Sequence, residues 1–280
     1  MREDAEIVQL KLDLIFKKVF GDAQNTDVIA EFISAMLDIP RESIHLVEIR
    51  NTEMTPDFLG LKFGRLDLCL EVDEQLVDIE MQVNQQPNYA ERSLFYWSKL
   101  YTSSLQSGDD YGVLRRAICI NILNYNLFDC EDYRSHFMVM EKERGEVLTD
   151  KFGVYFFELK KVKHARKYRR AQEWLELINA ETEGDLMAIE EKTNSKEIKK
   201  TIVRLRELSA DEQLREQYRL RQKAMMDERN AIHGSYAEGV SDGISRGRAE
   251  GEMMKENAIA ARMRKLGFSE EDIQRVLDLS

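Results

Sequence analysis

One short segment restricts what this chain can fold into more than any other. Residues 65–83 alternate between apolar and polar side chains with a period of two on either side of Asp73-Glu74, with Leu76 as the one exception. Such alternation is typical of half-buried β-strands, because successive side chains point to opposite faces. We therefore predict a hairpin in which the numbers of paired residues sum to 147, so that Asp67 lies opposite Glu80. The apolar face then comprises Leu66, Leu68, Leu70, Val72, Val77, Ile79, Met81 and Val83.

The polar face brings two carboxylates together. Directly opposed residues lie about 5 Å apart at their Cβ atoms, and like charges there repel. A divalent cation would offset the repulsion of Asp67 and Glu80, and oxygen ligands without histidine or thiolate favour Mg²⁺ or Mn²⁺. Such an ion activates water for phosphodiester hydrolysis, and Gln82, on the same face, is placed to orient that water. The alternative is an acidic face that points to solvent and binds no metal.

Other chemistries lack their motifs. The sequence contains no GxSxG, P-loop, HExxH or dinucleotide-binding glycine pattern, and its four histidines are scattered. Its three cysteines have no CxxC spacing, which indicates a reducing cytoplasm and no disulfide framework. There is no apolar run of about 18 residues, so we expect no membrane span. The acidic N-terminus lacks the apolar core of a secretory signal.

Charge is distributed unevenly along the chain. Residues 1–150 carry 15 Lys and Arg against 28 Asp and Glu, and residues 151–280 carry 26 against 24. This balance argues against broad electrostatic binding of nucleic acid. One run is an exception and can neutralise phosphates, although a solvated helix start would also explain it. Its seven cations in eleven residues are Lys160, Lys161, Lys163, Arg166, Lys167, Arg169 and Arg170.

The rest of residues 1–163 predicts an α/β layer domain. Helix-spaced apolar residues occupy 10–20, with Gly21 as C-cap, and further helices are expected over 27–37 and 88–105. Besides the hairpin, the expected strands are 44–50, 117–123, 137–141 and 153–159.

The C-terminal part of the chain has a different composition. Residues 164–230 are charged, free of proline and expected to be helical. Small residues then recur at every fourth position, which lets two helices approach closely, although four glycines cost a helix about 4 kcal/mol. We predict a self-association helix followed by a small helical hairpin in residues 231–280, with Ser269 capping the last helix; a flexible linker is the alternative. The recurring small residues are Ala231, Ser235, Gly239, Gly243, Gly247 and Gly251.

Taken in order, several short motifs resemble those of the Rpn family of recombination-promoting nucleases and transposases, within the PD-(D/E)XK nuclease superfamily. The first and last of them are almost 150 residues apart, and the glycine-stripe tail also agrees with the family. The motifs are Asp13-x-x-Phe16-Lys17-x-x-Phe20-Gly21, Arg65-Leu66-Asp67, Ile79-Glu80-Met81-Gln82, Arg92-x-x-x-Tyr96, Gly108-x-x-Tyr111 and Glu158-Leu159-Lys160.

The resemblance implies a restriction-endonuclease-like mixed sheet flanked by helices, followed by a helical C-terminal extension. It implies a Mg²⁺-dependent (or Mn²⁺-dependent) DNA endonuclease in which Asp67 and Glu80 bind the metal. Asp13 is a weaker candidate for a further ligand. Gln82 takes the place of the superfamily lysine, so the sequence departs from the general motif there.

DNA contacts follow from the same resemblance. On the helix after the hairpin, Arg92, Tyr96 and Lys99 share one face and are expected to approach phosphates, although core packing would also explain Tyr96. From the basic run we expect contacts by Lys161, Lys163, Arg166, Lys167 and Arg170.

Two rival functions stay open. One is a nuclease-fold protein with weak or no hydrolysis that acts by binding DNA or a partner, which Gln82 and the acidic first half favour. The other is a defence or toxin nuclease that its oligomeric tail holds inactive.

Overall fold

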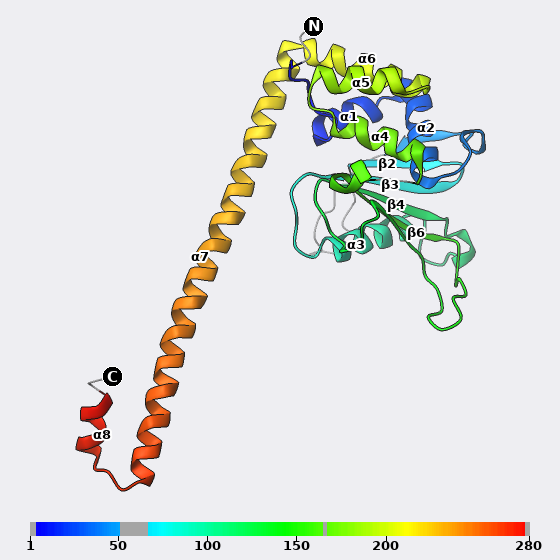
Figure 1. The fold of residues 1–280 in the computed structure, drawn as a ribbon. Coiled ribbons are helices and arrows are strands. Elements are labelled where there is room, and N and C mark those ends of the chain that lie inside the picture. The colour runs from blue at the N-terminus through cyan, green and yellow to red at the C-terminus, as the bar shows by residue number, and fades with distance from the viewer. Residues whose placement is uncertain (1–3, 51–66, 165–166, 278–280) are drawn as a thin grey trace. The chain divides into compact units, whose positions relative to one another are not determined.

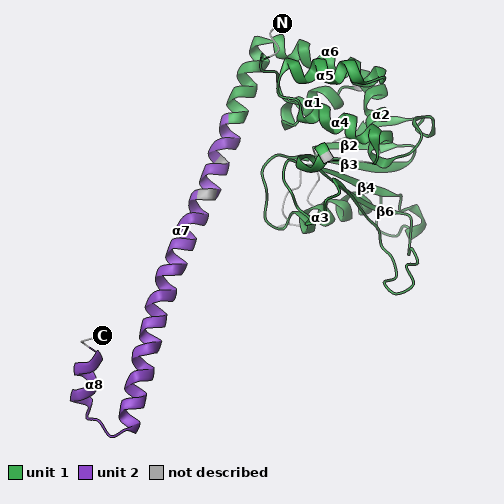
Figure 2. Ribbon diagram, in the orientation of Figure 1, with its two compact units in different colours: residues 1–222 green, residues 223–280 purple. Residues whose placement is uncertain are grey.

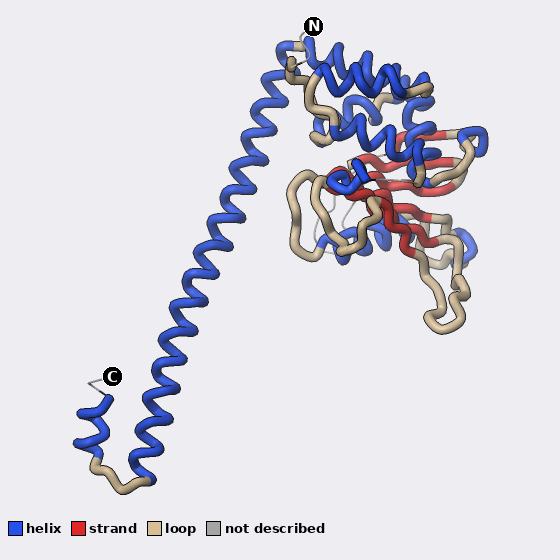
Figure 3. The backbone as a smooth tube through the Cα atoms, viewed as in Figure 1, coloured by secondary structure: helices blue, strands red, loops and turns tan. Residues whose placement is uncertain are grey.

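The computed structural model describes residues 4–50, 67–164 and 167–277, and the chain divides into two compact units, Met1–Gln222 and Lys223–Ser280 (Figure 2). The six strands found among the described residues all lie in the first unit (Figure 3). The second is helical. Residues 164–222, for which the sequence indicated a separate region, belong to the same compact unit as the sheet.

The sheet is mixed, with strand order β1-β2-β3-β4-β6-β5. Its centre, β3-β4-β6, is parallel, and the remaining neighbours are antiparallel. The strands are β1 (Val47–Arg50), β2 (Leu68–Val72), β3 (Gln75–Gln82), β4 (Ala117–Leu123), β5 (Arg134–Phe137) and β6 (Phe152–Glu158). Together with the flanking helices this is the restriction-endonuclease-like α/β fold that the sequence predicted.

The predicted hairpin register is confirmed by β2 and β3. Leu68 pairs with Ile79 and Val72 with Gln75, so the paired numbers sum to 147. At the tip, Asp73 and Glu74 both have positive φ, 45° and 68°, as a tight two-residue hairpin turn requires. The Asp73 carboxylate also accepts the N–H groups of His45 and Leu46 at 3.0 and 2.9 Å, which holds the turn against the start of β1. Arg65 and Leu66 lie outside the described residues.

The expectation of a half-buried hairpin is wrong, because β3 is buried on both faces. Its polar residues Asp78 and Glu80 are 0% and 2% exposed, and Ile79 between them is also fully buried. The reason is topological: β3 lies between β2 and β4, and helices cover both faces of the sheet (Figure 1). Helix α3 (Tyr89–Thr102) packs over the face that carries Asp78 and Glu80.

The opposite face is covered by helices from both ends of the first unit (Figure 1). An aromatic cluster of Phe16, Phe20, Phe32 and Trp174 joins α1, α2 and α4, with ring centroids 4.7–6.4 Å apart. The N–H of Gly21 donates to the Lys17 carbonyl at 2.8 Å, so Gly21 ends α1 as predicted. The helices are α1 (Asp13–Phe20), α2 (Thr26–Leu37), α4 (Arg169–Asn179), α5 (Glu183–Lys192) and α6 (Lys196–Ala210), with short 3-10 turns η1 (Ala23–Asn25), η2 (Arg41–Ser43), η3 (Tyr111–Val113) and η4 (Leu159–His164).

The remaining strand predictions differ in accuracy. The buried strands β4 and β6 lie at the predicted positions within one residue, because continuous apolar runs mark them. β5 begins at Arg134, three residues before the prediction, because this edge strand opens with the polar residues Arg134, Ser135 and His136.

The second unit begins inside α7 (Glu212–Lys265) and ends with α8 (Glu270–Leu277). The glycine stripe is therefore helical rather than a flexible linker. Within this unit Ala260 and Ile273 are buried, and the Ser269 hydroxyl accepts the N–H of Asp272 at 3.2 Å, as the predicted cap requires. Along the described part of the chain, no helix combines the length and apolar character needed to span a membrane.

Candidate metal centre at the end of a buried hairpin

Asp67 and Glu80 meet where the hairpin strands leave the sheet. The Asp67 N–H donates to Glu80 Oε1 at 3.0 Å, and the Met81 N–H donates to Asp67 Oδ2 at 3.1 Å. Each carboxylate is thus held by backbone next to the other, as the register arithmetic predicted. The two side chains lie beside one another and are positioned by main-chain hydrogen bonds.

Burial makes this pair electrostatically unfavourable. Loss of solvent around Glu80, together with the nearby charge of Asp67, raises the pKa of Glu80 to about 8. A buried carboxylate keeps its proton because the charged form has lost its hydration and faces a like charge. A site of this kind gains stability from a cation, whether a side chain or a metal ion.

Asp78, two residues before Glu80 on the same face of β3, is a third acid at this end of the hairpin. Within the described residues its Oδ1 is buried without a hydrogen-bond partner, while its Oδ2 accepts from the Cys119 thiol at 3.6 Å. Burial first, and then the charges of Glu80 and Asp67, raise the pKa of Asp78. Its spacing of two residues from Glu80 is the sequence signal that could have identified it.

Lys17 reaches the site from a different element. Its Nζ lies 3.1 Å from Asp67 Oδ1, and it projects from α1, some fifty residues earlier in the chain. The amide of Gln82 instead donates to Glu80 Oε2 at 3.2 Å. The positive charge missing at position 82 is therefore present beside Asp67. The sequence contained Lys17 within a motif, but nothing in its spacing joined it to the hairpin.

Asp13, the weaker candidate ligand, has a different partner. Burial alone would raise the pKa of Asp13, but the hydrogen bond and charge of Arg221, 2.6 Å away, lower it overall. Within residues 4–50, 67–164 and 167–277, no three acidic, histidine or cysteine side chains converge in a metal-binding arrangement. The candidate centre therefore consists of Asp67 and Glu80.

Helix α3 contributes Arg92 and Tyr96 to the edge of the site. Arg92 Nε donates to the Tyr96 hydroxyl at 2.8 Å, and the positive charge of Arg92 partly offsets the rise in the pKa of Glu80. Tyr96 is 6% exposed and packs against Cys69 and Leu76. Tyr96 therefore packs in the core and also orients Arg92. Lys99, which is partly exposed, lies further along the same helix.

The basic run is divided in its contacts. Lys161 forms an ion pair with buried Glu158 at 2.7 Å and also donates to the Phe128 carbonyl. Arg170 binds Glu31 at 2.9 Å. Both residues therefore hold elements together, whereas Lys163 and Lys167 are exposed and Arg166 lies outside the described part of the chain.

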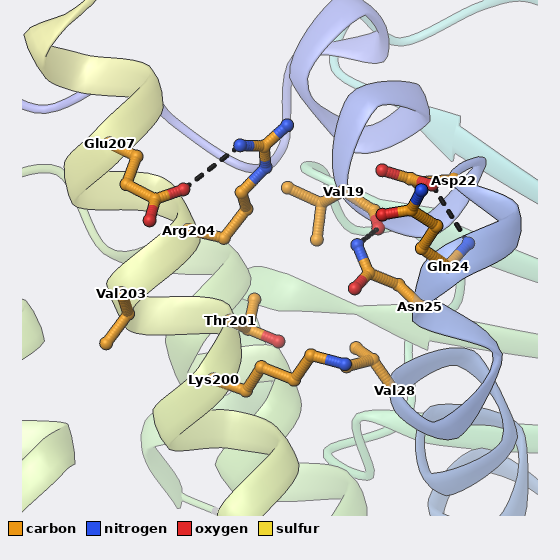
Figure 4. Close-up of a pocket in the computed structure, with 10 residues that line it drawn as sticks. All are labelled: Val19, Asp22, Gln24, Asn25, Val28, Lys200, Thr201, Val203, Arg204 and Glu207. Atoms are coloured by element: carbon orange, nitrogen blue, oxygen red, sulfur yellow. Dashed lines mark hydrogen bonds and ion pairs between the residues drawn. The ribbon is translucent and has the colours of Figure 1, made fainter.

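A separate cavity of about 440 Å³ lies between the α1–α2 segment and α6 (Figure 4). Its charged side chains already have partners. Arg204 pairs with Glu207 at 3.0 Å, Lys200 pairs with Asp27 at 2.8 Å, and the Asp22 carboxylate accepts the N–H of Gln24 at 2.9 Å. It contains no paired acids, so it offers no catalytic chemistry comparable to that of Asp67 and Glu80.

The mixed sheet and the acid pair at the end of its central hairpin define a protein of the restriction-endonuclease-like α/β class. Residues 10–235 match the model of the family described as PD-(D/E)XK nuclease family transposase. The chain belongs to that family, and its function is related to nucleases and transposases. Searches among curated proteins and among solved structures each found no match.

Proposed function

We propose that the protein is a DNA endonuclease that uses Mg²⁺ or Mn²⁺ held by Asp67 and Glu80. The observation that carries this proposal is the acid pair of buried Glu80 and half-buried Asp67, whose carboxylates are fixed side by side by the backbone N–H groups of Asp67 and Met81. Carboxylate oxygens are hard donors of the kind that divalent cations prefer. A divalent cation would also neutralise the negative charge that destabilises this site. The direct test is divalent-dependent nicking of supercoiled plasmid DNA.

The surrounding side chains have distinct roles in this proposal. When bound, the ion would supply Lewis-acid chemistry, activating water and neutralising a phosphate oxygen. Gln82, hydrogen-bonded to Glu80, orients the attacking water through its amide. The Lys17 ammonium stabilises the negative charge that develops on the phosphate, because a fixed cation in a poorly hydrated site acts strongly on developing charge.

Lys17→Met is expected to lower the nicking rate by about 10²-fold, the usual effect of removing one group that stabilises a transition state. It should leave Mg²⁺ affinity unchanged or tighter, because Lys17 competes with a metal for Asp67. The measurement is nicking kinetics combined with isothermal titration calorimetry. Lys17→Arg, which keeps the charge, is the control and should restore part of the rate; a parallel loss of Mg²⁺ binding in Lys17→Met would show a structural role instead.

DNA is proposed to approach across Arg92, Tyr96 and Lys99 on α3. Exposed Lys163 and Lys167 of the basic run are proposed as further DNA contacts, and Arg166, which lies outside the described residues, is proposed from the sequence alone. Lys161 and Arg170 are proposed to act indirectly, since both are held by acidic partners.

A second candidate is a DNA- or partner-binding protein that has lost hydrolysis. Two observations favour it: Gln82 stands in place of a lysine, and the Lys17 ammonium already forms an ion pair with Asp67. Titration of Mn²⁺ separates the two candidates. No binding heat, with or without DNA, would favour this second function.

The helical tail is proposed to join copies of the chain. Glycines 239, 243, 247 and 251 are open to close approach, since a Cβ added at any of them would meet nothing within 4 Å. Exposed Tyr236, Val240 and Ile244 follow the stripe one position further along.

Deletion of residues 231–280 is expected to lower the oligomeric mass measured by light scattering to that of a monomer. If the tail also restrains the nuclease, as in a defence or toxin system, the truncated protein should nick DNA faster. An unchanged mass would contradict the tail interface, and a shortened chain lacking only 268–280 provides the control.

A further inference from the structure

A second cavity lies at the same end of the parallel strands as the candidate centre. It has a volume of about 840 Å³ and is lined by Asn126 and by residues 130–134, 160–161 and 167–168. Gln82, Leu123 and Glu158 are in register across β3, β4 and β6, so these strands end together. At about 4.8 Å per strand, the end of β6 lies roughly 10 Å from the end of β3.

An arginine in this cavity is held rigidly and has unused hydrogen-bonding capacity. The Arg134 guanidinium lies 4.3 Å from the Tyr168 ring centroid and 5.2 Å from that of Tyr155. Its Nε is buried and has no hydrogen-bond partner among the described residues. Buried donors normally have a partner, so an unpaired one beside a cavity points to a missing acceptor.

The tyrosine over this arginine is itself fixed in an uncommon conformation. Tyr168 has φ 59°, a left-handed value that is uncommon outside glycine. The Tyr133 hydroxyl donates to the carbonyls of Lys167 and Tyr168 at 3.1 and 3.0 Å, which holds the segment in place. Strained residues persist where the surrounding structure requires them, often at ligand sites.

Two further cations line the cavity. Lys160 and Lys167 are exposed, and no ion pair forms at either within the described segments. Lys161 is neutralised by Glu158. Exposed Glu131 and Asp132 also line the cavity, so its net charge is small. Selectivity for a phosphate must therefore come from the placement of the Arg134 guanidinium beside Lys160 and Lys167.

We propose that this cavity binds a backbone phosphate of the DNA strand whose cleavage is proposed above. Arg134 donates to the phosphate through the outer nitrogens of its stacked guanidinium, since its Nε is closed to solvent, and Lys160 and Lys167 add positive charge at the cavity. Arg134 lies on β5, three strands from β3, so at about 4.8 Å per strand this phosphate lies on the order of 15 Å from the one at Asp67 and Glu80. This inference rests on the proposed function, because the ligand is the DNA that the nuclease would cleave. It gives that DNA a second contact with the protein.

The test is fluorescence anisotropy of a 3′-labelled 20-base-pair duplex, titrated in EDTA over a range of salt concentrations. For the full-length Lys160→Gln, Lys167→Gln double variant, the slope of log affinity against log salt should fall in magnitude by about 1.8, and affinity at 0.1 M salt by about 60-fold. The matched control, Lys142→Gln with Lys199→Gln, removes two exposed lysines outside the cavity and should change affinity by less than about three-fold.

Arg134→Lys distinguishes a specific phosphate site from nonspecific electrostatic attraction. It keeps the charge but loses the planar fork and the aromatic stacking, so affinity should fall about ten-fold. Equal effects of the two double variants, or unchanged affinity in Arg134→Lys, would overturn the proposal. So would deficits confined to duplexes with a 5′-phosphate, which would indicate a site for terminal phosphates or free nucleotides.

Because EDTA removes divalent ions, the binding result does not depend on hydrolysis. Loss of binding by the cavity variant in a protein that fails to nick DNA would refute the nuclease and leave the phosphate site standing. Normal nicking with equal binding by all variants would support the nuclease and refute the phosphate site.

Discussion

Asp67→Asn is expected to lower divalent-dependent nicking of supercoiled plasmid by at least about 10³-fold. The substitution keeps the shape of the side chain, so an oxygen can still accept the Met81 N–H, but it removes the charge that a metal needs. A metal that polarises a phosphoryl oxygen contributes several kcal/mol to the transition state, and each 1.36 kcal/mol is a factor of ten in rate. Initial nicking rates on agarose gels measure the effect.

The matched control is Asp150→Asn, an exposed aspartate in the loop before β6. It should nick at the wild-type rate within a factor of two. Equal nicking by wild type and Asp67→Asn would reject Asp67 as part of the catalytic centre, and nicking without any divalent ion would reject the metal mechanism.

Metal-free protein is expected to lose stability as pH rises from 6 to 9. The pKa of Glu80 is about 8 in the folded protein because of burial and Asp67, but ordinary in the unfolded chain. Between the two values the folded state binds more protons, so the free energy of unfolding falls with rising pH through the folded pKa. The raised pKa of Asp78 acts in the same direction. Over this pH interval the loss attributable to Glu80 should be roughly 2–3 kcal/mol, because only the two pH units up to the folded pKa contribute.

Urea unfolding in EDTA at pH 6 and pH 9 measures this loss, and Glu80→Gln provides the comparison. The variant cannot ionise there, so it should be more stable than wild type at pH 9, and Mg²⁺ should stabilise only the wild type. Glu143→Gln, an exposed carboxylate in the β5–β6 loop, should follow the wild-type profile. Identical pH dependence in wild type and Glu80→Gln would contradict the buried acid pair.

The sequence was sufficient to predict the hairpin and its register. Alternation with period two and the Asp73-Glu74 interruption determine which residues pair, because a slip of one residue would exchange the faces. The same arithmetic brought Asp67 to Glu80, and the backbone hydrogen bonds of Asp67 and Met81 follow from that register.

Burial of the polar face could not be predicted from that pattern. Alternation indicates two unlike faces but not what covers each one. The cover is α3, which packs across β3 and β4, so that Asp78 and Glu80 are buried and the pKa of each is raised.

Lys17 was missed for a related reason. Its contact with Asp67 joins an N-terminal helix to a hairpin some fifty residues later, and local spacing carries no information on such a contact. The basic run shows the converse: seven cations close in sequence include Lys161 and Arg170, which fold back onto Glu158 and Glu31. Cations that serve the site are therefore identified by tertiary contact rather than by density in the sequence.

The central claim is that Asp67 and Glu80 share one divalent ion, and a crystal structure grown with Mn²⁺ tests it most directly. The account predicts an anomalous difference peak about 2.0–2.6 Å from a carboxylate oxygen of each residue, with Lys17 displaced from Asp67. Absence of a peak between these two carboxylates, or a peak held by other residues, would contradict it.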